Sequence, residues 1–200
     1  MSRVTPRAAR LAAWIAVPAA LVASGVVVST ASYSAFSATT STPTSNWTAG
    51  TVALSNDATA NTALFAATNL KPGSTDSRCI TVTSSGSLPS TVKLYATSPQ
   101  TTSVLATNTT IKIEQGTGGG FASCSGFTPA TTGGTIFDDS LPNLGTQATG
   151  FANGLGTWTT AGSANETRVY RVTYTVAPAT PNAAQGTTAS IGLTWEAQNN

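Results

Sequence analysis

The stretch TRVYRVTYTV, residues 167–176, decides the fold of this chain. Large apolar side chains recur at every second position, which is the period of a β-strand rather than of a helix. They give the predicted strand one apolar face, made of Tyr170, Val172, Tyr174 and Val176. A strand of this length with one apolar face needs a second layer to cover it, which favours packed sheets.

The same alternation recurs in shorter runs after residue 46. The predicted strands cover residues 47–54, 63–70, 78–83, 91–95, 109–115, 135–138, 157–160 and 188–198. Turn-forming residues separate them, and residues 140–144 suggest one short helical turn. We therefore expect an all-β chain in which residues 47–200 form a single antiparallel β-sandwich. A jelly-roll-like connection is favoured over an immunoglobulin-like one, because no Trp lies between the two cysteines.

The first 35 residues are typical of an export signal. Three arginines and no acid precede residues 11–28, which carry no charge, and small residues follow up to Ala35. A basic head, an apolar middle and a small-residue end define a secretory signal peptide. A retained transmembrane helix is the alternative, because residues 11–28 approach the length that crosses a bilayer. Either helix would leave the sandwich secreted or on the extracellular face of the cell membrane.

The chain contains two cysteines, Cys79 and Cys124, a number that agrees with export. An even number of cysteines in such a protein favours a disulfide. This disulfide would close a loop long enough to stabilise the fold by about 4 kcal/mol. Two reduced thiols in the core are the alternative, since free cysteines are often buried.

Charge and composition exclude several classes of function. The formal net charge of +2 depends on the three leader arginines, so the exported part has no basic patch for nucleic acid. The chain contains no histidine, which removes His-based catalytic triads and most zinc chemistry. No cofactor is expected. The Ser/Thr-rich residues 36–46 cannot build a core and are predicted to form an extended polar arm.

Few acidic residues remain as candidates for a site. A Ca²⁺ site using Asp57, Asp76 or Asp138 is conceivable, because loops supply oxygen ligands readily. Glycosidase chemistry would need two carboxylates about 5–10 Å apart, such as Glu166 and Glu196. Solvated surface acids are the simpler interpretation of all five residues, and we expect no metal or catalytic site.

Three tryptophans in the predicted domain allow two interpretations. Trp47, Trp158 and Trp195 could form a platform on which sugar rings stack. Aromatic residues also dominate the cores of small β-domains, and we favour this core position.

Three segments resemble a known family in their order and spacing. They are SYSAFSATTSTPTSNWTAGTVALS at residues 32–55, LKPGSTDSRCITVTSSGSLPSTVKLY at residues 70–95, and LTWEAQ at residues 193–198. Together they resemble the TasA and camelysin-type exported proteins, and in particular the actinobacterial members of that group. The junction after the leader and residues 70–95 are the specific parts of this resemblance.

The resemblance implies an exported jelly-roll subunit that a dedicated signal peptidase cuts between Ala35 and Phe36. TasA-like proteins assemble into matrix fibres in which the N-terminal arm of one subunit completes the sheet of the next. The matching arm here begins at Phe36, which would anchor it in a pocket of the neighbour. Pro43 would occupy a position where the sheet needs no hydrogen-bond donor.

Our leading expectation is therefore a structural, surface or extracellular-matrix protein, as in a biofilm, that assembles with copies of itself. An extracellular binding module for wall carbohydrate or for a partner protein is the alternative. A metal-dependent endopeptidase is the third possibility, because camelysin is described as one. We do not transfer that activity, since this chain has no histidine and no evident metal-ligand cluster. An uncleaved leader would instead tether the chain to the membrane through residues 11–28.

Overall fold

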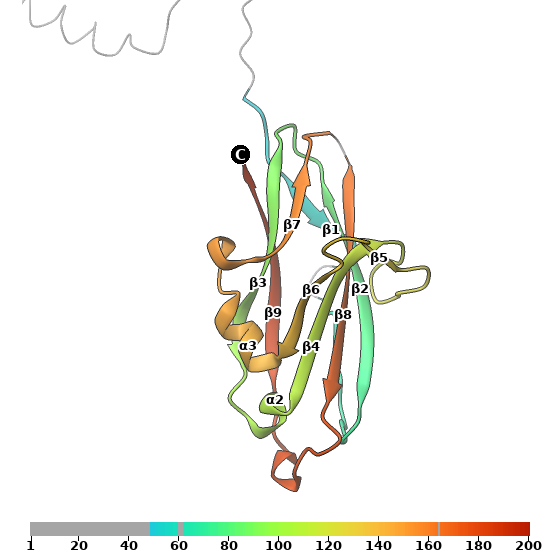
Figure 1. Cartoon of the computed structure of the whole chain (residues 1–200), viewed down its shortest axis with the longest axis vertical. Coiled ribbons are helices and arrows are strands. Elements are labelled where there is room, and N and C mark those ends of the chain that lie inside the picture. The colour runs from blue at the N-terminus through green and yellow to red at the C-terminus, as the bar shows by residue number, and fades with distance from the viewer. Residues whose placement is uncertain (1–48, 60–61, 164) are drawn as a thin grey trace, which may run out of the picture. The chain divides into compact units, whose positions relative to one another are not determined.

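A computed structural model of the chain describes residues 49–59, 62–163 and 165–200, and residues 49–200 form one compact unit. Two antiparallel sheets pack face to face in this unit, so the predicted β-sandwich is confirmed (Figure 1). The leader, the arm with Phe36 and Pro43, the cleavage position at Ala35 and Trp47 lie outside the described residues. Within them, no helix is long and apolar enough to cross a membrane.

The described strands are divided between a larger and a smaller sheet. In the larger sheet, the order is β1 (Leu54–Asn56), β2 (Thr75–Ser84), β8 (Glu166–Val176), β4 (Thr109–Thr117) and β5 (Thr128–Pro129), with β6 (Thr135–Ser140) also paired to β4. In the smaller sheet, the order is β7 (Leu155–Thr160), β3 (Ser90–Gln100) and β9 (Ser190–Asn199). Short helices α2 (Val104–Thr107) and α3 (Leu141–Gln147) and the 3₁₀ turns η2 (Phe151–Asn153) and η3 (Asn182–Ala184) connect them.

Strand β8 lies at the centre of the larger sheet, between β2 and β4. Its predicted apolar face points into the sandwich, where Tyr170 and Val172 are almost completely buried. Leu94 of β3 and Ile113 of β4 are fully buried in the same core. Burial of such side chains stabilises the fold by about 1.5–3 kcal/mol each, so the inner face of β8 contributes directly to the stability of the core.

The predicted helical turn at residues 140–144 is present at the start of α3. The Ser140 hydroxyl accepts a hydrogen bond from the backbone N–H of Asn143, at 3.3 Å, and therefore caps the helix. Pro142 lies in the first turn, where no intrahelical donor is needed. Leu141 and Leu144 then pack against the core between the sheets.

Two predicted strands are wrong or shorter than expected. Residues 63–70 form no strand, although their sequence alternates as a strand would. In the described part of residues 47–54, only Leu54 belongs to a strand, because the chain pairs with β2 from that residue onward. An apolar pattern does not report whether a neighbouring strand is present, which explains the error at residues 63–70.

Candidate functional site: the open edge of strand β9

Strand β9 has only one partner. It pairs with β3 along its length, with Lys93 opposite Glu196 and Tyr95 opposite Thr194. No other described strand pairs with β9, so its second edge presents unpaired backbone N–H and C=O groups. An edge of ten residues is long enough to template the addition of a further strand.

The inner face of β9 is also incompletely covered. Ile191, Leu193 and Trp195 point into the sandwich, yet each remains partly exposed. By contrast, Leu94 of β3 and Trp158 of β7 are 0% and 4% exposed. The sandwich is therefore packed on its β7 and β3 side and under-filled beside β9.

A cavity of about 960 Å³ occupies this under-filled region. It extends over apolar side chains of both sheets, and its lining includes Ile80, Val172, Tyr174, Ile191, Leu193 and Trp195. A cavity of this size with mostly apolar walls is in the range that binds ligands or peptide segments. The open edge and the cavity lie on the same strand, and we call this combination the β9 cleft.

An aromatic pair supports the β9 wall of the cleft from behind. The rings of Tyr170 and Trp195 lie 5.4 Å apart at an interplanar angle of 54°, which joins β8 to β9. The indole Nε1 of Trp195 is buried on the side of this aromatic pair. Burial raises the pKa of the Tyr170 phenol well above its ordinary value, so this side chain is uncharged at neutral pH.

Residues 63–70, which we call the strap, border the same cleft. The ring of Phe65 packs edge-on against Tyr174, with 5.2 Å between the ring centroids. Leu64 and Leu70 are half-buried, while residues 66–69 between them are exposed. No backbone–backbone hydrogen bond joins the strap to another described residue. Side-chain contacts alone therefore hold it in the described structure.

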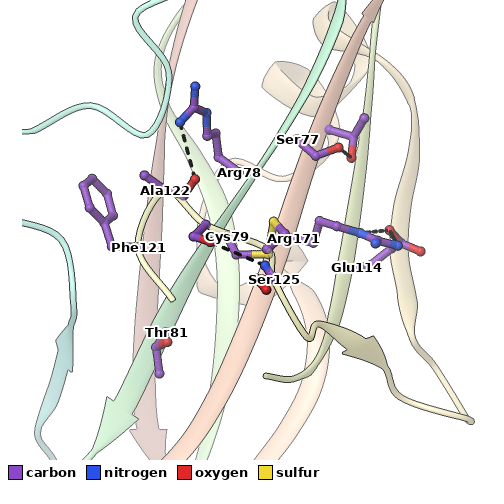
Figure 2. The surroundings of a disulfide bond; sticks show 12 residues. Ser77, Arg78, Cys79, Thr81, Glu114, Phe121, Ala122, Ser125 and Arg171 are labelled. Atoms are coloured by element: carbon purple, nitrogen blue, oxygen red, sulfur yellow. Dashed lines mark hydrogen bonds and ion pairs between the residues drawn. A yellow bond between two sulfur atoms is a disulfide. The ribbon is translucent and has the colours of Figure 1, made fainter. Parts of the chain in front are cut away.

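The predicted disulfide between Cys79 and Cys124 is confirmed, and it lies on the other face of the larger sheet (Figure 2). Cys79 is fully buried, although the alternation of β2 points its side chain away from the core, on the other face of the strand from Ile80. The Gly-rich loop between β4 and β5 covers it, and the N–H of Ala122 donates to the carbonyl of Cys79 at 2.9 Å. Gly118 and Gly119 have φ values of 79° and 82°, which allow this loop to fold back onto the sheet.

The acidic candidates do not gather into a metal-type cluster among the described residues. Asp57 accepts hydrogen bonds from the N–H groups of Thr81 and Phe121, both at 2.8 Å. Asp76 pairs with Arg78 at 3.0 Å. Within the described ranges, Asp138 is likewise in no cluster of three or more residues that could hold a metal ion. Asp57 instead fastens the chain after β1 to β2 and to the disulfide-bearing loop.

The two glutamates considered for glycosidase chemistry have separate structural partners. Glu166 accepts hydrogen bonds from the N–H groups of Ala161 and Ser163. Glu196 accepts from the amide of Gln198 at 2.8 Å and from the hydroxyl of Tyr95 at 2.9 Å. These bonds lower the pKa of Glu196, the Gln198 bond having the larger effect. A glycosidase acid needs a raised pKa, so Glu196 does not have the environment of one.

Of the two described tryptophans, Trp158 takes the core position that we favoured, whereas Trp195 is partly exposed and lines the β9 cleft. Trp158 is 4% exposed, and the guanidinium of Arg168 lies 5.7 Å from its ring centroid. Trp195 belongs to the inner face of β9. Neither indole is presented on an outer sheet face as a platform for sugar rings.

No protein-family model and no curated protein matches this sequence. Function must therefore be inferred from the site itself. The disulfide is typical of proteins in oxidising, extracellular compartments, in agreement with the expected export of the chain. The sequence identified the apolar face of β9 but gave no signal that the strand would lie at an edge, because that position depends on which distant strands pair.

Proposed function

We propose that this protein is an exported structural subunit of a jelly-roll-like, TasA-related type that assembles by strand donation. The arm of one copy, residues 36–46, would add to the open edge of β9 in the next copy. The observation that carries this proposal is the β9 cleft, where an unpaired edge and an incompletely covered apolar face occur on one strand.

The arm and the edge match in length and in chemistry. An extended segment advances about 3.3 Å per residue, so residues 36–46 span nearly the same distance as the ten residues of β9. Main-chain hydrogen bonds to β9 would satisfy its free edge, and Phe36 would place an aromatic ring against the apolar wall. Pro43 lacks an N–H and would take a position where that group points away from β9.

Removal of residues 1–35 would make the arm available. A cut between Ala35 and Phe36 by a signal peptidase leaves Phe36 at a free chain end, where it can enter a neighbouring cleft. Donor and acceptor are different surfaces of the same chain, so the contact between copies is head-to-tail. Head-to-tail contacts that do not close into a ring propagate as filaments, which suits a surface or matrix fibre.

Electron microscopy of two purified chains tests this proposal. Residues 36–200 should form fibres, whereas residues 47–200 should remain monomeric. Phe36→Ser should impair assembly of the longer chain, while Ser37→Ala, on the opposite side of the same extended arm, should not. Fibres from both chains, or from neither, would contradict strand donation.

A further inference from the structure

We propose that the strap is a placeholder in the β9 cleft that the incoming arm must displace. This inference rests on the proposed function and concerns the regulation of the same site. It predicts that an isolated subunit holds its cleft in a self-covered form, and that assembly exchanges one internal segment for one donated strand.

The strap covers surface that a donated strand needs. Its residues border the cavity together with Ile191, Leu193 and Trp195, which form the apolar face of β9. The Phe65 ring packs against the ring of Tyr174 on the opposite wall and covers it. An arm that pairs with β9 and buries its anchor in the cleft would compete with Phe65 for these walls.

The strap is held weakly in its middle. Residues 66–69 are exposed, and no side-chain or backbone hydrogen bond joins residues 63–70 to another described residue. A strand in the same place would gain backbone hydrogen bonds along the edge of β9 that the strap does not make. The donated arm would therefore bind more strongly than the strap through its backbone hydrogen bonds, whatever its side chains contribute.

Both flanks of the strap are fixed, which makes it a tethered segment. On one side, Asp57 binds the backbone of β2 and of the disulfide-bearing loop. On the other side, the N–H of Gly73 donates to the carbonyl of Val176 at 3.0 Å. The turn at residues 71–74 is closed by a bond from the N–H of Ser74 to the carbonyl of Lys71, at 2.9 Å. The strap can thus leave the cleft without unfolding the sheets.

Binding of a synthetic arm peptide separates this inference from the proposed function. The receptor is residues 47–200, which contains the compact unit and its disulfide. The probe is the peptide FSATTSTPTSN with a free N-terminus. Phe65→Ala should bind it about 2- to 10-fold more tightly than the unsubstituted receptor, because an edge-on aromatic pair contributes an equilibrium factor of that order.

Phe127→Ala is the matched control, since it removes a ring from the outer face of the larger sheet, away from the cleft. It should leave the affinity unchanged. Equal affinity of the Phe65→Ala receptor and the unsubstituted receptor would overturn the placeholder and leave strand donation intact. Weaker binding by Phe65→Ala would make Phe65 part of the receptor and also overturn it. A peptide that binds no receptor would refute strand donation itself.

A second readout follows the strap directly. In a receptor labelled with 4-fluorophenylalanine, the ¹⁹F signal that disappears in Phe65→Leu belongs to Phe65. Saturation with the arm peptide should shift this signal to its position in the unfolded chain, because the ring moves into water. A Phe65 signal that stays unchanged while the peptide is bound would show that the strap remains in the cleft.

Discussion

The guanidinium of Arg171 and the carboxylate of Glu114 form an ion pair across β8 and β4, with 2.6 Å between Nη2 and Oε2 (Figure 2). The Glu114 side chain is only 8% exposed, and Arg171 also lies over the ring of Phe127, 4.6 Å from its centroid. The pair therefore joins the centre of the larger sheet to the loop that carries Cys124.

Loss of the Glu114 charge should destabilise the domain measurably. Glu114→Gln keeps the shape of the side chain but leaves Arg171, which is 30% exposed, without its carboxylate partner. We expect a loss of about 1–3 kcal/mol in the free energy of unfolding, measured by urea denaturation. Lys112→Ala is the control. Lys112 also pairs with Glu114, at 3.4 Å, but its side chain is exposed, so the pair should contribute under about 1 kcal/mol to the free energy of unfolding. Equal effects of the two substitutions would refute the structural role of the buried pair.

Removal of the disulfide should have a larger effect. Cys79 and Cys124 are separated by 45 positions, and a loop of that size corresponds to about 4 kcal/mol in the chain-entropy model. The double variant Cys79→Ala, Cys124→Ala should unfold at a lower temperature than the oxidised protein. It should also be insensitive to added reductant, whereas the unsubstituted protein should lose stability. A double variant as stable as the oxidised protein would contradict the bond's contribution.

Stability should fall in alkaline solution because of Tyr170. Burial raises its folded-state pKa above the ordinary value of 10.0, while the unfolded chain keeps that value. The contribution is complete below pH 10 and decreases above it, by up to about 1.4 kcal/mol per pH unit. Tyr170→Phe cannot ionise, so its urea midpoint should decline less steeply between pH 9 and pH 11. Parallel declines in the two proteins would refute this assignment.

Assembly should depend on one face of β9. Leu193 points into the cleft and its neighbour Thr194 points to the outer face, opposite Tyr95. Leu193→Lys should abolish fibre formation by residues 36–200, because a charged side chain obstructs the apolar wall. Thr194→Lys adds the same charge on the outer face and should still form fibres. Thermal unfolding of both variants verifies that the monomers are folded.

The sequence predicted best the strands that are paired with another strand along both edges. Residues 167–176 were predicted as a strand, and β8 spans Glu166–Val176. Its alternation is informative because β8 is covered by the core on one face and paired along both edges. The pairing of Cys79 with Cys124 was likewise predictable, since only two cysteines are present.

The cleft could not be predicted, because it depends on partners far away in the chain. Residues 63–70 contain enough apolar residues to suggest a strand, yet nothing in them reports that no strand lies beside them. Alternation puts Cys79 on the face of β2 that points away from the core, and only the folded loop around Ala122 explains its burial. The open edge of β9 is a property of strand order, which local patterns do not encode.

Hydrogen exchange resolved along β9 tests strand donation most directly. In the monomer, amides of β9 that point away from β3 lack a strand partner and should exchange rapidly. In fibres of residues 36–200, the same amides of residues 190–199 should become protected together with those of the arm. Fibres in which β9 stays unprotected, while the edge of β2 or β7 gains protection, would contradict donation to β9.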